Sequence, residues 1–179
     1  MRDIIYDVAV TLDGFIAAPG GDVSTFPMEG PHADAYGQRL AGYSTVIMGR
    51  ATYEFGYAYG LPPGARAYPR MDHHIFSQSG HVPTDKEVRV IAEDWLDEIA
   101  RLRQSEGGAI YLCGGGQFAG FVANAGHLTD LVLKRVPISL GDGIPLFKGL
   151  DAPLPAQPVS QDAYANGVAL ERYKITGIG

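Results

Sequence analysis

Three consecutive glycines, Gly114-Gly115-Gly116, stand where a ligand that carries phosphate could bind. They follow the apolar segment Ala109–Cys113, which is typical of a strand, and precede a helical pattern that begins near Gln117. Glycines at such a turn let the backbone come close to a ligand, because no Cβ atoms intervene. The helix start adds unpaired N–H groups and a partial positive charge, which suit a pyrophosphate. The simpler interpretation is a tight turn between a strand and a helix.

A second turn of the same kind lies earlier in the chain. Gly49-Arg50-Ala51-Thr52 follows the predicted strand Thr45–Met48 and opens a predicted helix. The Thr52 hydroxyl suits a helix cap or an anion, and the planar Arg50 guanidinium suits a phosphate monoester. An arginine that is merely exposed to solvent is the alternative.

Ser77-Gln78-Ser79 follows a third predicted strand and fits either a ligand contact or a polar loop. Ligands of open α/β sheets bind outside the carboxyl ends of strands. Three strand ends with residues that favour anions therefore indicate a dinucleotide.

The elements that must position these residues alternate along the chain. Apolar segments rich in Val and Ile predict strands at Ile4–Thr11, Thr45–Met48, His74–Ser77, Val88–Ile91, Ala109–Cys113 and Leu131–Ile138. Apolar residues at helical spacing predict helices around Ala33–Leu40, from Ala51, around Trp95–Leu102 and around Phe118–Ala125. Asp94 is placed to cap the third of these helices.

This alternation predicts a three-layer α/β fold, with a mixed, mostly parallel sheet between helices on both faces. Asn166-Gly167 lies between Val159–Tyr164 and Val168–Thr176, which predicts a hairpin with a two-residue turn. The carboxyl-terminal part should therefore add an antiparallel hairpin at the edge of the sheet. A length of 179 residues and a hydrophobic content of 46% fit one domain over residues 1–179.

Composition argues against several classes of protein. A net charge of −6 disfavours a nucleic-acid binder, which usually carries a basic face. The single cysteine, Cys113, rules out a disulfide or a cysteine-based zinc site within one chain. The first apolar segment contains an acid and does not read as a signal peptide, and no apolar segment approaches the roughly 20 residues of a membrane span. We therefore expect a cytoplasmic protein that does not bind membranes.

The histidines do not predict a metal site, because none of them has the spacing of metal ligands. They are His32, His73, His74, His81 and His127. His73 and His74 are adjacent in a strand and should point to opposite faces.

Five segments, in order along nearly the whole chain, resemble the dihydrofolate reductase-like superfamily, in the branch of the RibD C-terminal domain of riboflavin biosynthesis. They are residues 11–17, 46–54, 75–77, 110–116 and 141–147. The resemblance implies a dihydrofolate reductase-like fold, NADPH as cofactor, hydride transfer to a small heterocyclic or carbonyl substrate, and a homodimer.

The resemblance also implies roles for individual residues in binding NADPH. The phosphates would be held by Gly49, Arg50 and Thr52, with Arg50 on the 2′-phosphate. The adenosine end would lie near Ser77 and Gln78. The pyrophosphate and the nicotinamide ribose would be cradled by Gly114, Gly115, Gly116, Gln117 and Phe118. The nicotinamide would be lined by Ala9, Ile16 and Ala17, whose mostly small side chains let a flat ring approach.

Two carboxyl groups are candidates for a proton source, because a carboxylic acid with a raised pKa can protonate a reduced substrate. Asp34 lies on the predicted first helix, where a solvated side chain is the alternative. Asp13 follows the first strand, near the expected nicotinamide, where a turn-forming residue is the alternative. Two other functions stay open: the 5-amino-6-(5-phosphoribosylamino)uracil reductase of the riboflavin pathway, and a non-catalytic domain that senses NADPH.

Overall fold

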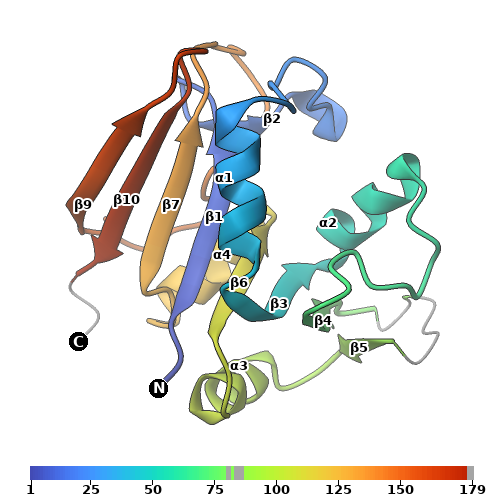
Figure 1. Cartoon of the computed structure of the whole chain (residues 1–179). Helices are drawn as coiled ribbons and strands as arrows, with labels where there is room; N and C mark the ends of the chain where they lie inside the picture. Colours follow the sequence, from blue (N-terminus) through green and yellow to red (C-terminus); the bar gives the residue numbers. More distant parts are fainter. Residues whose placement is uncertain (80–81, 83–86, 177–179) are drawn as a thin grey trace.

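The structure, a computed structural model, describes residues 1–79, 82 and 87–176, and is built on an eight-stranded sheet (Figure 1). The strand order is β5-β4-β3-β6-β1-β7-β10-β9. The strands are β1 (Ile4–Val10), β3 (Tyr43–Gly49), β4 (Asp72–Phe76), β5 (Val88–Ile91), β6 (Ala109–Gly114), β7 (Asp130–Arg135), β9 (Ala156–Ala163) and β10 (Ala169–Ile175). All pairs from β5 to β7 are parallel, and β10 is antiparallel to β7 and β9. The predicted mixed sheet with an antiparallel carboxyl-terminal hairpin is confirmed.

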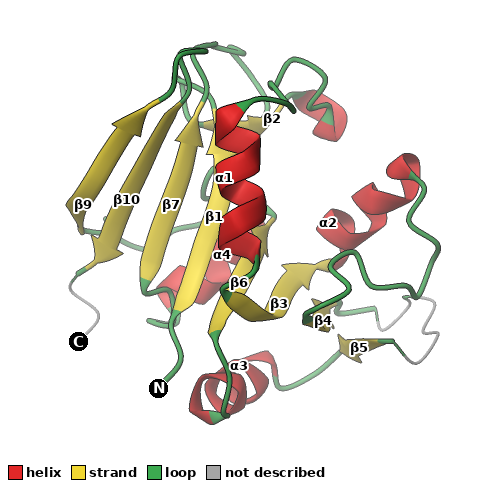
Figure 2. Ribbon diagram, in the orientation of Figure 1, coloured by secondary structure: helices red, strands yellow, loops and turns green. Residues whose placement is uncertain are grey.

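Helices cover both faces of the sheet, which confirms the three-layer arrangement (Figure 2). The helices are α1 (Pro31–Leu40), α2 (Arg50–Phe55), α3 (Trp95–Gln104) and α4 (Gly116–Asn124), with short 3-10 helices at η1 (Pro19–Gly21) and η2 (Gly56–Tyr59). Ile99 of α3 and Val122 of α4 pack with Ile47 of β3 in one core, and Tyr53 of α2 packs with Val46 of β3 in the other. Consecutive apolar residues in the strands therefore bury both faces of the sheet.

A small second sheet, which the sequence did not predict, pairs β2 (Phe15–Ala17) with β8 (Ile144–Pro145). Gly143 makes this pairing possible, because a Cβ atom there would lie 2.1 Å from the carbonyl oxygen of Ala17. Strands of two or three residues are too short to show a period of alternation in the sequence.

Two local predictions are wrong. The hairpin has a three-residue loop, Ala165-Asn166-Gly167, closed by a hydrogen bond of 2.8 Å from the Tyr164 N–H to Val168 O. Gly167 has a φ of +83°. This is typical of three-residue hairpin loops, in which a type I turn is followed by a residue in the left-handed region that forms a bulge. Asp94 precedes α3 but has a φ of +51° and makes no capping bond through its side chain. Its backbone oxygen instead accepts the Glu98 N–H.

The two adjacent histidines of β4 point to opposite faces, as predicted. His73 Nε2 accepts the Tyr68 N–H at 3.1 Å, and Nδ1 lies 3.0 Å from Met71 O, which fixes one neutral tautomer. His74 Nδ1 lies 3.0 Å from a carboxylate oxygen of Glu98 on α3. Burial lowers the pKa of both imidazoles. His81 lies outside the described residues.

The buried histidines predict that acid destabilises the fold. In the unfolded chain they bind a proton near pH 6.5, whereas in the folded protein they do so only at lower pH. The unfolded state therefore binds more protons below pH 6.5, and stability falls there by up to about 1.4 kcal/mol per pH unit for each histidine. Urea unfolding measured from pH 7.5 to 5.5 should show that the free energy of unfolding falls less steeply for His73→Gln than for wild type. Identical pH slopes would contradict this assignment.

Candidate functional site

The two glycine turns lie side by side at the carboxyl ends of neighbouring parallel strands. Met48 of β3 pairs with Gly114 of β6, so the turns that lead into α2 and α4 are adjacent. A Cβ atom on Gly115 would lie 2.9 Å from Thr52 Oγ1. One on Gly49 would lie 3.5 Å from Phe118 Cβ. The structure thus brings together residues that the sequence places more than 60 positions apart.

The backbone at this junction is free to bind an anion. Gly114 and Gly115 have φ values of +144° and +90°, which side chains rarely allow. Gly49 and Gly115 precede α2 and α4 and have no side chain that could cap these helices. The first N–H groups of each helix are therefore not bonded to a capping side chain and can donate to a ligand. The longer helix, α4, therefore presents an uncapped amino terminus directly behind the glycine turn.

The third glycine has a different reason to be there. A Cβ atom on Gly116 would lie 2.1 Å from Pro145 O, and the Lys148 N–H donates to Gly116 O at 2.9 Å. One turn further along α4, a Cβ atom on Gly120 would lie 2.2 Å from Lys148 O. Gly116 therefore lets residues 145–148 cross the start of α4, whether or not a ligand is bound.

The side chains around the junction differ in exposure. Arg50 keeps 46% of its side chain exposed, and its Nε lies 3.9 Å from Glu54 Oε1, a weak surface pair that leaves the guanidinium available. Gln78 and Gln117 are also exposed. The side chains of Ser77 and Phe118 are buried, so these two residues offer a ligand only their backbone groups. The Phe118 ring packs against Phe76 in the core.

The predicted nicotinamide wall is divided between two packing clusters. Ala9 of β1 packs with Val136, whereas Ile16 of β2 packs with Leu146. Ala17 is buried beside Gly143 in the small sheet. The three residues line the end of β1 and the small sheet that follows it.

Neither candidate proton source is buried. Asp34 is exposed on α1. The Asp13 carboxylate accepts the Thr11 hydroxyl and the N–H groups of Leu140 and Gly141, at 3.0 and 2.7 Å for the two backbone donors. These bonds, first that of Thr11, hold the pKa of Asp13 below its usual value. Asp13 therefore ties the turn after β1 to the segment around residue 140, and the catalytic role of both acids stays a prediction.

A buried ionic cluster beneath α1 was not singled out from the sequence. Asp7 of β1 is fully buried and accepts bonds from Arg39 Nε at 2.8 Å, Arg39 Nη2 at 3.2 Å and the Tyr43 hydroxyl at 3.1 Å. Lys134 Nζ lies 3.5 Å from Asp7 Oδ1 and 3.6 Å from the centre of the Tyr36 ring. The signal was an acid in one apolar strand and a lysine in another, Leu131-Val132-Leu133-Lys134.

Burial shifts the titration of this cluster. It lowers the pKa of the Lys134 ammonium group, although Asp7 attracts that charge. Burial also favours the neutral form of Arg39, but the hydrogen bonds to Asp7 and its charge outweigh this effect and hold the pKa of the guanidinium above its usual value. Hydroxyl groups extend the network, since the Tyr36 and Tyr111 hydroxyls lie 2.8 Å apart, and burial raises the pKa of both phenols.

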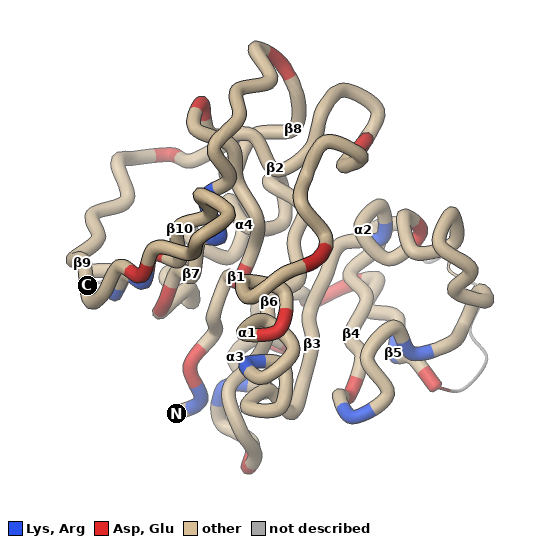
Figure 3. The backbone as a smooth tube through the Cα atoms, turned by 45° about the horizontal axis from the view of Figure 1, so that its top comes forward, with Lys and Arg blue, Asp and Glu red and all other residues tan. Residues whose placement is uncertain are grey.

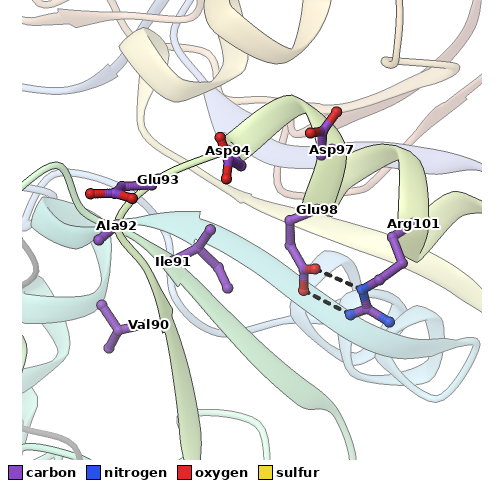
Figure 4. A pocket seen from close by; sticks show the side chains of 8 residues that line it. All are labelled: Val90, Ile91, Ala92, Glu93, Asp94, Asp97, Glu98 and Arg101. Carbon is purple, nitrogen blue, oxygen red and sulfur yellow. Dashed lines mark hydrogen bonds and ion pairs between the residues drawn. The ribbon is translucent and has the colours of Figure 1, made fainter.

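A hollow of about 400 Å³ lies where β5 ends and α3 begins (Figure 4). Half of its eight lining residues are acidic, namely Glu93, Asp94, Asp97 and Glu98, and its one basic residue, Arg101, pairs with Glu98 through two bonds of 2.7 Å. Such a lining disfavours phosphate. Elsewhere acidic and basic positions are interspersed along the elements (Figure 3). Across residues 1–79, 82 and 87–176, no group of three or more His, Cys, Asp or Glu is arranged to hold a metal, and no helix is long and apolar enough to span a bilayer.

The sequence profile of the RibD C-terminal domain matches residues 2–170, so the chain belongs to that family. The protein YwjB of Bacillus subtilis (strain 168) is 31% identical over 152 residues, which is 83% of this chain and 84% of YwjB. YyaP of the same organism is 27% identical over an alignment of 184 positions that covers 98% of this chain and 96% of YyaP.

Solved structures agree on the fold. A protein from Shewanella sp. PV-4 has a TM-score of 0.83 at 21% identity, over 99% of this chain and 100% of that one. Dihydrofolate reductase from Enterococcus faecalis, complexed with NADP(H), has a TM-score of 0.69 at 16% identity, over 98% and 97%. A deaminase/5-amino-6-(5-phosphoribosylamino)uracil reductase from Thermotoga maritima has a TM-score of 0.70 at 14% identity. The match covers 98% of this chain and 57% of that one. These likenesses confirm the dihydrofolate reductase-like fold.

Proposed function

We propose that this chain is an NADPH-dependent reductase that acts on a small planar heterocycle of the pyrimidine or pterin type. The observation that carries the proposal is the junction of two uncapped glycine turns, where the Gly115 backbone lies so close to Thr52 that a Cβ atom on Gly115 would come within 2.9 Å of Thr52 Oγ1. A pyrophosphate needs close, unobstructed N–H donors of this kind.

Each residue at the junction has a proposed task. N–H groups behind Gly115 bind the pyrophosphate, Thr52 donates a hydroxyl bond, and Arg50 binds the 2′-phosphate. Gln78 and Gln117 offer exposed amides at the two ends of the cofactor. The small side chains of Ala9 and Ala17 leave room for the flat nicotinamide ring. NADPH would supply a hydride there. We also propose one domain over residues 1–179, a homodimer and a cytoplasmic location.

The riboflavin-pathway reductase is the second candidate function, because the matching family carries the RibD name. Assays of NADPH oxidation with dihydrofolate and with the phosphoribosylaminouracil separate the two activities. Tight NADPH binding without oxidation by any pterin, pyrimidine or carbonyl compound would favour the non-catalytic sensor.

Arg50 gives the test of the cofactor. We expect wild type to bind NADPH at least tenfold more tightly than NADH, since one charge-assisted bond to phosphate contributes about 1.5–3 kcal/mol. Arg50→Ala should abolish most of that preference, whereas Arg70→Ala, which removes another exposed arginine, should keep it. Fluorescence titrations of the three proteins measure both constants. Equal binding of NADPH and NADH by wild type would contradict the assignment.

A further inference from the structure

The cluster beneath α1 carries more positive charge than its own residues balance. The ion pairs of the described residues place one carboxylate, that of Asp7, against two cations, Arg39 and Lys134. Asp7 is fully buried, and the two cations keep only 15% and 12% of their side chains exposed. A surplus cation in such a place is costly unless something pairs with it.

One donor of the cluster is also left over. Arg39 uses Nε and Nη2 on Asp7, and its buried Nη1 has no hydrogen-bond partner among the residues that the structure describes. A buried guanidinium nitrogen without a partner costs about 1–3 kcal/mol. Lys134 Nζ lies 3.5 Å from Asp7 and 3.6 Å from the centre of the Tyr36 ring, which leaves at least one of its three protons for another acceptor. Both cations thus retain donors.

The surplus charge lies next to the proposed site of reduction. Lys134 of β7 is the register partner of Ala9 on β1, the residue assigned to the nicotinamide wall. Asp7 lies two residues before Ala9 and therefore on the same face of β1. A substrate ring stacked on a nicotinamide at Ala9 would have Lys134 at its edge, and Lys134 Nζ lies over the Tyr36 ring, 3.6 Å from its centre. Arg39 is bound to the same Asp7 carboxylate as Lys134.

We propose that Lys134 and Arg39 form a subsite for one negative charge on the substrate, so that the substrate is a planar ring with a carboxylate or a comparable anionic oxygen. The anion completes the cluster, giving two cations and two anions: it accepts a free proton of Lys134, and its charge also balances that of Arg39. This inference rests on the proposed reductase function, because that function makes the space beside Ala9 the substrate site. Asp7 is then a positioning residue, since it holds both cations.

Orotate and uracil test this subsite, because they share a pyrimidinedione ring and differ in one carboxylate. We expect calorimetry on the purified full chain to give orotate a Kd at least tenfold lower than that of uracil. Lys134→Met should raise the orotate Kd at least tenfold and leave that of uracil unchanged. Lys174→Met removes an exposed lysine that is paired with Asp130 and should leave both constants as they are.

A second measurement separates binding from a merely structural role. Without ligand, Lys134→Met should unfold at a higher urea concentration than wild type, because it removes the surplus cation and leaves the Asp7–Arg39 pair intact. Equal affinity of wild type for orotate and uracil, no orotate binding, or unchanged orotate binding by Lys134→Met would each overturn the subsite. NADPH titration of the same samples distinguishes the two ideas. Orotate binding without NADPH binding would overturn the reductase function alone, and the reverse would overturn the subsite alone.

Discussion

Asp7→Ala is expected to lower the free energy of unfolding by about 3–5 kcal/mol, a large part of the roughly 5–15 kcal/mol that holds a domain folded. The wild-type carboxylate is fully buried and pairs with Arg39 and Lys134, at 2.8 and 3.5 Å. Its removal leaves two buried cations without a counterion. Urea unfolding at pH 7.5 measures the change.

The matched control for this prediction is Asp162→Ala. Asp162 accepts a bond from Arg172 at 3.0 Å, but 60% of its side chain is exposed. Exposed pairs contribute about 0–1 kcal/mol, so this variant should unfold close to wild type. The double variant Asp7→Ala with Lys134→Met should recover part of the loss, because one of the unpaired cations is gone. A loss below about 1 kcal/mol for Asp7→Ala alone would show that the cluster does not stabilise the fold.

Gly115→Ala is expected to weaken NADPH binding by at least about 100-fold, since two charge-assisted bonds contribute roughly 3 kcal/mol or more. The added methyl group would lie 2.9 Å from Thr52 Oγ1, so the two turns would have to move apart. The φ of +90° and ψ of +107° at Gly115 also strain any side chain. Fluorescence titration with NADPH measures the loss.

A control must separate the effect of backbone strain from the loss of the pyrophosphate site at the junction. Gly149 has a φ of +77°, and a methyl group added there would have no atom within 4 Å, so Gly149→Ala strains the backbone without displacing a neighbouring residue. It should lose stability of about 1–2 kcal/mol and bind NADPH normally. If Gly115→Ala and Gly149→Ala bind NADPH equally well, the junction does not hold the pyrophosphate.

The sequence predicts the sheet and its glycine turns well because both depend on local patterns. Runs such as Val46-Ile47-Met48 suit a strand buried on both faces, and glycines directly after them mark the turns into helices. Parallel strands bring their carboxyl ends to one edge, and the pairing of β3 with β6, which the sequence did not predict, makes Gly49 and Gly115 neighbours on it. The hairpin prediction was wrong by one loop residue, since Gly167 serves a bulged turn.

The ionic cluster could not be predicted, because its members are neighbours only in the folded chain. Arg39 lies 32 residues from Asp7 in sequence, and Lys134 reaches Asp7 only through the pairing of β7 with β1. The role of Gly116 is also non-local, since it depends on Pro145 crossing α4. A charged residue inside an apolar strand was the one visible signal, and it indicates that a partner exists without identifying it.

A crystal structure of the protein with bound NADPH tests the central claim most directly. We expect both phosphates of the pyrophosphate to lie at the junction, within about 3.2 Å of N–H groups at the start of α4 and of Thr52 Oγ1, a normal hydrogen-bond distance. We also expect the 2′-phosphate beside Arg50 and the nicotinamide against Ala9. A pyrophosphate bound elsewhere, for example in the hollow at the end of β5, would contradict the proposed cofactor site.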